Sequence, residues 1–247
     1  MSGFINLEKL PYPVKKRFIP FLEELLSVHG DQVVSVFIYG SATGQNYIHE
    51  ISDINSVVVF SDLNFSVLKK SLKTISKGKS QKITAPLFLT KAHIESSLDV
   101  FPLEFLDMKE NYVVIYGEDI LSKFQVNSQH VRLLCEHELK GKLIRIRQAY
   151  LEGGLDKKHI KMILQESLNS LIPIFKNLIR LKNKQPLADK EKVLLTLCQE
   201  FGLNQDVFLL IYKDRTKEAE IAHADAEIFI ERYLAELQKL VSRVDEL

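Results

Sequence analysis

One segment, residues 33–60, limits the folds open to this chain more than any other. An apolar run over residues 33–39 ends at Gly40-Ser41, and a second apolar run opens with Asp53-Ile54-Asn55 after a loop. Short apolar runs bounded by turn residues are typical of strands. Gly40 allows a tight turn that can approach a phosphate, and the Ser41 hydroxyl and the following amides can donate to its oxygens. Alternate strand residues share a face, so Asp53 and Asn55 are predicted to point the same way.

The rest of the chain predicts an α/β (α+β) domain followed by an all-α domain. Apolar spacing predicts a helix over residues 13–29, and further strands are expected at 83–89 and 112–116, with a short helix at 65–75. Strands alternating with helices favour a mixed sheet with helices packed on it. Beyond residue 125 the pattern is only helical. Helices are predicted at 128–152, from Asp156 to about 181, and at 190–201, 206–212 and 219–244. The predicted domains are residues 1–125 and 126–247.

Charge and composition exclude some classes of protein. The chain has 33 Lys and Arg residues against 32 acids, so its net charge of +1 gives no strong nucleic-acid signal. No apolar stretch is long enough to span a membrane, and the first residues do not resemble a signal peptide. Cys135 and Cys198 lie far apart in apolar helical patterns and are predicted to be buried free thiols. These features together predict a cytoplasmic protein.

The turn and the paired positions resemble the signature of the nucleotidyltransferase superfamily, in which a Gly-Ser turn holds nucleotide phosphates and an Asp-x-Asp pair holds magnesium. The order of an α/β domain and a helical domain resembles kanamycin-type aminoglycoside nucleotidyltransferases, and minimal nucleotidyltransferases coupled to HEPN-type helical domains. Residues 101–119 and 135–152 are similar to segments of bacterial nucleotidyltransferases. The resemblance implies a nucleotidyltransferase-like mixed sheet with Gly40 and Ser41 as the nucleotide-binding residues. It also implies ATP or another nucleotide as ligand.

The same resemblance indicates a depleted metal site. Transfer to or from the α-phosphate in that superfamily uses two metal ions held by carboxylates. Here Asp53 is the predicted metal ligand, but Asn55 stands where the second acid is expected. A third acid on a later strand is missing too, since residues 63–94 contain no Asp or Glu. Each lost charge costs about 4 kcal/mol at roughly 4 Å and an effective dielectric of about 20, or about three decades of affinity. Magnesium binding is therefore expected to be weak.

Other side chains were weighed as replacements. The resemblance implies a glutamate from the helical part as general base, with the helical domain as the second wall of a cleft, and Glu138 is the candidate. Glu50, Glu104, Asp107 and Glu136 are alternative acids, and His49 is the histidine placed to meet a nucleotide. The lysines of residues 69–91 can bind phosphates or form a solvated face. The pattern leaves both readings open.

These features favour a catalytically impaired nucleotidyltransferase-fold protein, a pseudoenzyme, that binds a nucleotide or phosphate group at Gly40-Ser41. The first alternative is an active metal-dependent enzyme that moves a nucleoside monophosphate to a small-molecule or protein hydroxyl through Asp53, Asn55 and Glu138. The second is an interaction module whose α/β domain is only a scaffold. The acceptor and the oligomeric state are left open.

Overall fold

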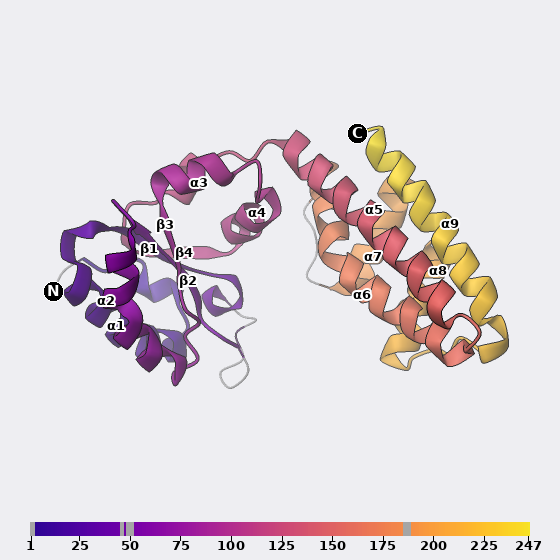
Figure 1. Ribbon diagram of the computed structural model, residues 1–247, viewed down its shortest axis with the longest axis horizontal. Helices are drawn as coiled ribbons and strands as arrows, with labels where there is room; N and C mark the ends of the chain where they lie inside the picture. Colours follow the sequence, from indigo (N-terminus) through magenta and orange to yellow (C-terminus); the bar gives the residue numbers. More distant parts are fainter. Residues whose placement is uncertain (1–2, 45–46, 48–51, 185–188) are drawn as a thin grey trace. The chain divides into compact units, whose positions relative to one another are not determined.

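The computed structural model describes residues 3–44, 47, 52–184 and 189–247 (Figure 1). The chain divides into two compact units, Met1–Asn127 and Ser128–Leu247. The first combines a sheet with helices, and the second is helical. The predicted fold class, a mixed α/β sheet with helices followed by an all-α bundle, is confirmed.

The first unit is built around a four-stranded sheet in the order β3-β2-β1-β4. Its strands are β1 (Val33–Tyr39), β2 (Asn55–Phe60), β3 (Leu87–Thr90) and β4 (Tyr112–Gly117). Strand β1 runs antiparallel to both neighbours, whereas β2 and β3 are parallel. Beyond β4, Phe4 forms an isolated antiparallel bridge with Tyr116, and Ile5 N–H donates to Ile115 O at 2.9 Å.

Helices cover both faces of this sheet. On one face, α1 (Tyr12–His29) and α2 (Phe65–Lys79) pack on a core that includes Ile38, Val58 and Phe60. On the other, Phe37, Val57 and Val59 belong to a core with residues of α3 (Lys91–Ser97) and α4 (Pro102–Glu110). The alternation of buried side chains along β1 and β2 therefore supplies both cores, as expected for strands covered on both sides.

Local signals explain where the helices of this unit begin and end. The buried positions of α1 follow the predicted helical spacing, and Gly30, with φ of 52°, ends the helix in a conformation that favours glycine. Asn64 caps α2, because its side-chain oxygen accepts from Ser66 N–H at 3.0 Å and from Val67 N–H at 3.3 Å.

Helix α6 forms the centre of the second unit. The bundle consists of α5 (Ser128–Gly153), α6 (Lys157–Leu181), α7 (Lys190–Phe201), α8 (Gln205–Thr216) and α9 (Ala226–Asp245), and α6 packs against each of the others. Asp156 caps α6, as predicted, by accepting from Lys158 N–H at 2.9 Å. Cys135 and Cys198 are free and buried, also as predicted, and burial raises the pKa of each thiol to about 12. Of the helices that the structure describes, none is both long and apolar enough to cross a bilayer.

Some predicted boundaries were wrong. The strand expected at residues 83–89 begins only at Leu87, because Pro86 has no N–H for the ladder, and Ile83 makes just an isolated bridge to Ile54. The strand expected to open at Asp53 begins at Asn55. The last helix starts at Ala226 and not at residue 219. Helices α3 and α4 were not predicted at all.

Candidate functional site

The Gly-Ser turn follows the end of β1 as a short 3-10 turn, Gly40–Thr43. Gly40 N–H donates to Asn111 O at 2.8 Å, and Thr43 Oγ1 donates to Gly40 O at 2.8 Å. Gly40 has φ of 76°, and a Cβ placed on it would meet no atom within 4 Å. These two hydrogen bonds hold the turn in place, while the space on the Cβ side of Gly40 is open. Only glycine combines that backbone angle with free access to the peptide groups.

The register of β1 and β2 places both predicted motifs at the same end of the sheet. Tyr39 pairs with Asn55, so Gly40 and Ser41 leave β1 beside the residues that lead into β2. Asn55 is half-buried, and Ser41 and Asp53 are exposed. Within the described part of the chain, none of these three side chains forms a hydrogen bond or an ion pair with another residue. Their polar atoms therefore remain available to a ligand.

Asp53 also lines a pocket of about 560 Å³ on the side of α2. The lining residues come from the second half of α2 and from the segment that enters β3: Ile75, Ser76, Lys79, Lys82, Ile83, Thr84 and Ala85. Among these described residues Asp53 is the single carboxylate, and two lysines accompany it. Neither the Gly-Ser turn nor Asn55 lines this pocket. Asp53 thus opens onto a cation-rich surface and not onto a cluster of acids.

The segment that leads into β3 pairs with the residues that lead into β2. Ile54 and Ile83 form a parallel bridge, Ile54 N–H donates to Lys82 O at 2.9 Å, and Thr84 N–H donates to Ile54 O at 3.1 Å. Thr84 therefore follows Ile83 as Asn55 follows Ile54, and it contributes a hydroxyl instead of a carboxylate.

These side chains do not fit a pair of magnesium ions. One carboxylate, one amide and one hydroxyl supply a single negative charge, whereas two divalent ions need several carboxylates to offset their charge. Across the described residues, no group of three or more His, Cys, Asp or Glu side chains could hold a metal ion. What remains at this end of the sheet is a set of hydrogen-bond donors with lysines nearby.

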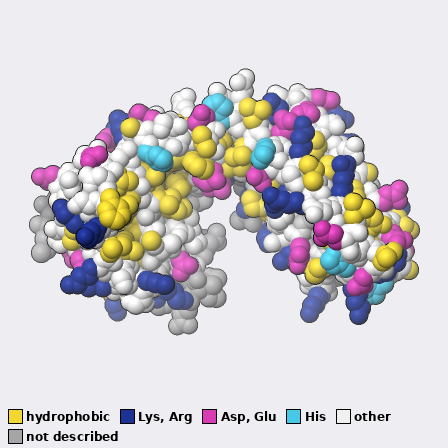
Figure 2. Space-filling model, in the orientation of Figure 1, with side chains coloured by type: hydrophobic (Ala, Val, Ile, Leu, Met, Phe, Trp, Pro, Cys, Tyr) yellow, Lys and Arg dark blue, Asp and Glu magenta, His cyan; other side chains and the backbone are white. Residues whose placement is uncertain are grey.

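The lysines of α2 and of the segment after it lie in three different surroundings. Lys79 and Lys82 line the Asp53 pocket, whereas Lys77 pairs with Glu24 of α1 at 2.7 Å. Other lysines of α2 are exposed beside three exposed apolar side chains, those of Phe65, Leu68 and Leu72. Figure 2 shows basic and hydrophobic side chains together on the part of the first unit where α2 runs. Only the end of this basic run is therefore placed to act on an anion near Asp53.

The other candidate acids that the structure describes lie on helices, and one of them is already paired. Glu104 and Asp107 are exposed on α4. Glu136 pairs with Arg132 at 2.9 Å and also with Lys140, so its charge is already offset. Glu50 and His49 lie outside the described residues.

Glu138, the predicted general base, belongs to α5 in the helical unit and is half-buried there. Its charge is felt by Cys135: burial is the main cause that raises the pKa of that thiol, Arg180 opposes it, and Glu138 adds to it. Among the described residues of its own unit, none forms a hydrogen bond or an ion pair with the Glu138 side chain. Its role as a base stays a prediction.

Comparisons with known proteins found little. No family model matches the chain, and no curated protein matches it. Among solved structures, a spectinomycin adenyltransferase from Enterococcus faecialis, crystallised with ATP and spectinomycin, aligns over 92% of this chain and 98% of its own. It is 14% identical, with a TM-score of 0.39.

Proposed function

We propose that this chain is a nucleotidyltransferase-fold protein that binds the phosphate groups of a nucleotide at the Gly40-Ser41 turn and does not carry out magnesium-dependent transfer. The register that brings the Gly-Ser turn beside the start of β2, with open space over Gly40, is the observation that supports the proposal most. It juxtaposes a glycine turn and an acidic strand opening, as nucleotide-binding members of the superfamily do.

The binding step rests on donors that the turn leaves free. The first amides of a helical turn have no partner within it, and the Ser41 hydroxyl has none among the described residues. Backbone amides gathered in a turn attract phosphate oxygens, and Lys79 and Lys82 add positive charge on the α2 side of Asp53. A phosphate bound at the turn would be held by hydrogen bonds rather than through a metal, and the two lysines, which line a different pocket, would add only longer-range attraction.

The impairment rests on the missing carboxylates. With Asn55 and Thr84 in place of acids, Asp53 alone faces the metals that the chemistry needs. Losing two charges near a divalent ion removes roughly 4 kcal/mol each at an effective dielectric of about 20. A loss of this size lowers the affinity for magnesium so far that the site should be largely empty at cellular magnesium concentrations. We also expect the protein to be cytoplasmic, consistent with its two free thiols.

Calorimetry with ATP, with and without magnesium, tests the proposal. We expect weak binding that changes little with magnesium. Ser41→Ala should weaken it by about tenfold, the value of one hydrogen bond to a charged group. Gly40→Ala should weaken it as well, because a methyl group would occupy the open space over the turn.

Gly30→Ala is the matched control. Gly30 also has a positive φ, 52°, and a Cβ there would also meet no atom within 4 Å, but it lies at the end of α1. The Gly30→Ala variant should carry a similar backbone strain without changing the affinity for ATP. If ATP does not bind, the scaffold alternative is favoured. If magnesium greatly increases the affinity for ATP and pyrophosphate is released, the active enzyme is favoured.

A further inference from the structure

The helical unit contains a pocket of about 270 Å³ whose wall is formed by α6, the start of α7 and the end of α8. Leu168 and Ile172, both buried, form an apolar floor. The polar residues around it are Gln165, Asn169, Lys190, Tyr212, Arg215 and Thr216, of which Gln165 donates its side-chain amide to Asp214 and Thr216 donates its hydroxyl to Lys213 O. An apolar floor with a few converging polar groups is the usual make-up of a small-molecule site.

The two cations at this pocket have neutral partners. Lys190 Nζ donates to Asn169 Oδ1 at 2.9 Å, and Arg215 Nη1 donates to the backbone oxygen of Gln165 at 3.1 Å. Neither forms an ion pair with any carboxylate in the described parts of the chain. A lysine has three donors and an arginine five, so most of their donors are unused. Two positive charges therefore face this pocket without an offsetting acid.

The other polar groups add donors as well. The Tyr212 hydroxyl, on a half-buried residue, makes no hydrogen bond within the described residues. Asn169 already uses its side-chain oxygen for Lys190, which leaves its amide N–H groups. A pocket in which donors outnumber acceptors is complementary to a ligand that accepts hydrogen bonds and carries negative charge.

The acids next to these cations in the sequence do not pair with them: Asp189 caps α7 by accepting from Lys192 N–H at 3.0 Å, and Glu191 pairs with Lys213 at 3.5 Å. Asp214 directly precedes Arg215, but its buried carboxylate accepts from Ile221 N–H at 2.8 Å and from Gln165 Nε2 at 2.5 Å, and it pairs with Lys161 at 3.2 Å. Gln165 thus joins the two: its side chain holds Asp214, and its backbone oxygen holds Arg215. The arginine is positioned through this link while its charge remains uncompensated.

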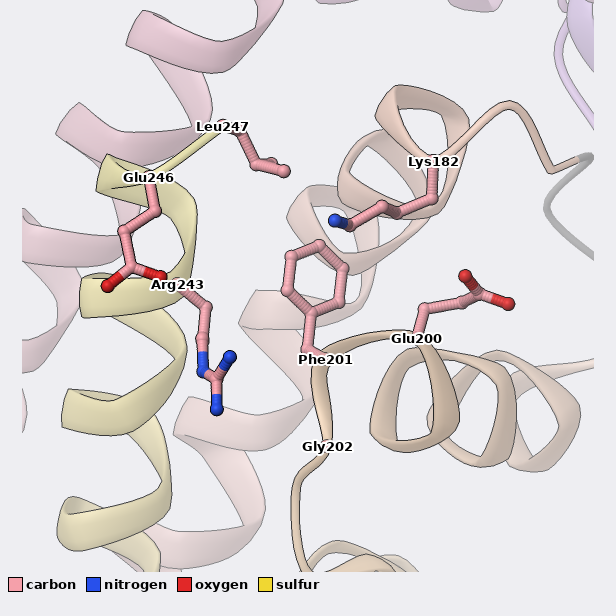
Figure 3. Close-up of a pocket in the computed structure, with 7 residues that line it drawn as sticks. All are labelled: Lys182, Glu200, Phe201, Gly202, Arg243, Glu246 and Leu247. Carbon is pink, nitrogen blue, oxygen red and sulfur yellow. The ribbon is translucent and has the colours of Figure 1, made fainter.

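A second pocket of the same unit shows the opposite arrangement. It measures about 220 Å³, and Figure 3 shows Lys182 reaching over the ring of Phe201, with Nζ 5.3 Å from the ring centroid. Here Lys182 and Arg243 are accompanied by two acids, Glu200 and Glu246. Its charges balance, so it gives no preference for an anion. Of these two pockets of the helical unit, the one of Lys190 and Arg215 is therefore the one whose described lining has an excess of positive charge.

We propose that the pocket of Lys190 and Arg215 binds a small organic anion, a carboxylate with a short apolar body. The carboxylate accepts from Lys190, Arg215 and Tyr212, and the apolar body lies on Leu168 and Ile172. The volume, near the lower end for ligand sites, limits the body to about ten non-hydrogen atoms. This site consists of residues of the second unit only, so the proposal does not depend on the proposed nucleotide site of the first unit.

Octanoate is the test probe, with octan-1-ol as the neutral control of equal length and acetate as the control without an apolar body. NMR titration of the full chain, with labelled Leu and Ile methyl groups, should show saturable shifts at Leu168 and Ile172. We expect a Kd for octanoate on the order of 0.1–1 mM, as is usual for a ligand of this size. Octan-1-ol and acetate should each bind at least about tenfold more weakly, because each lacks one half of the interaction.

Charge variants identify the site. Lys190→Gln and Arg215→Gln should each weaken octanoate about three- to tenfold and leave octan-1-ol unchanged. Both residues are exposed, so the fold should tolerate the changes. Lys213→Gln is the matched control, because Lys213 lies on the same helix but pairs with Glu191 at 3.5 Å and does not line the pocket. Equal binding of octanoate and octan-1-ol, equal losses in all three variants, or no saturable shift up to about 10 mM would each overturn the proposal.

Discussion

The two units treat their buried ionisable groups differently. In the first, His29 is only 5% exposed; its Nε2 lies 2.8 Å from Ser71 Oγ, and its Nδ1 has no partner among the described residues. Ser71 Oγ donates its one proton to Val67 O at 2.9 Å, so His29 Nε2 is the donor in their contact. In the second unit, Asp214 has three partners: Lys161 and Gln165 from α6, and Ile221 from the segment after α8.

The difference also appears at the surface. Where its sheet ends, the first unit has three polar side chains without a partner among the described residues, those of Ser41, Asp53 and Asn55. The acid that anchors α8 in the second unit, Asp214, has three partners. A saturated polar group stabilises a fold, and an unsaturated one is available to a ligand or a proton. Stability and ligand binding therefore depend on different polar side chains in this protein, so that a substitution can change one without changing the other.

The largest expected effect comes from restoring a charge at the unpaired end of the sheet. Asn55→Asp adds a second carboxylate beside Asp53 and should raise manganese or magnesium affinity by up to about three decades, if the lost charge is the whole cause. Metal titration by calorimetry measures it. The metal-free variant should be slightly less stable, because two nearby acids repel each other.

Thr84 provides the next step of this experiment. Adding Thr84→Asp to Asn55→Asp places a third acid on the neighbouring segment and should raise the affinity again, since Thr84 follows the Ile54–Ile83 bridge. Turnover need not return, because residues that act as a unit are not additive. If metal affinity stays unchanged in Asn55→Asp and also in Asp53→Ala, neither side chain faces a metal-capable site.

The next effect is on stability and contrasts two aspartates. Asp214→Ala should lower the free energy of unfolding by about 2–4 kcal/mol, because Ile221 N–H and the largely buried Lys161 lose their acceptor. Asp53→Ala should change it by less than about 0.5 kcal/mol, since that side chain is exposed and unpaired. Urea unfolding followed by circular dichroism, fitted with separate transitions for the two units, measures both. Similar losses in the two variants would contradict the contrast.

The smallest effect is a difference in acid sensitivity. Burial lowers the pKa of His29 below its ordinary value of 6.5, and the charge of Lys70 lowers it further. Near pH 6.5 the unfolded chain then takes up a proton that the folded chain does not, so the free energy of unfolding falls as the pH drops through and below 6.5. One such group changes the free energy by at most about 1.4 kcal/mol per pH unit.

The second unit should respond only at lower pH. Burial alone would raise the pKa of Asp214, but hydrogen bonds from Ile221, Gln165 and Lys161 outweigh it and leave the pKa below its ordinary 3.8. Its stabilisation is therefore present above pH 3.8 and is lost as the pH falls further. Unfolding measured between about pH 5 and 8 should show a slope that His29→Gln removes. His93→Gln, at an exposed histidine, should leave the slope intact.

Much of the fold could be predicted because its signals are local. The apolar spacing of α1, the strand β1 and the caps of α6 and α7 at Asp156 and Asp189 are all readable from a few neighbouring residues. Helix α4 was missed although Pro102 marks its first turn, because it has only nine residues and a weak apolar stripe. The late start of β3 follows from Pro86, a signal that was present in the sequence but not used.

The candidate site was predictable only in part. The Gly-Ser turn and Asp53 could be found because a glycine, a hydroxyl and an acid at strand ends are chemically distinctive. The place of Thr84 beside Asn55 could not, because it depends on the parallel bridge of Ile54 with Ile83. Likewise, no sequence pattern indicates that Lys190 and Arg215, from two different helices, share one pocket.

The bridge between Phe4 and Tyr116 has a consequence for how the protein behaves in a crowded solution. By donating to Ile115 O, Ile5 occupies backbone that β4 would otherwise offer to another molecule. At the opposite border, β3 offers only four residues, directly after Pro86. Exposed, long borders of sheets are where chains add to one another and aggregate. One edge strand of this sheet, β4, is covered by the first residues of the chain, and the other, β3, is short. The sheet is therefore protected against edge-to-edge pairing with other molecules.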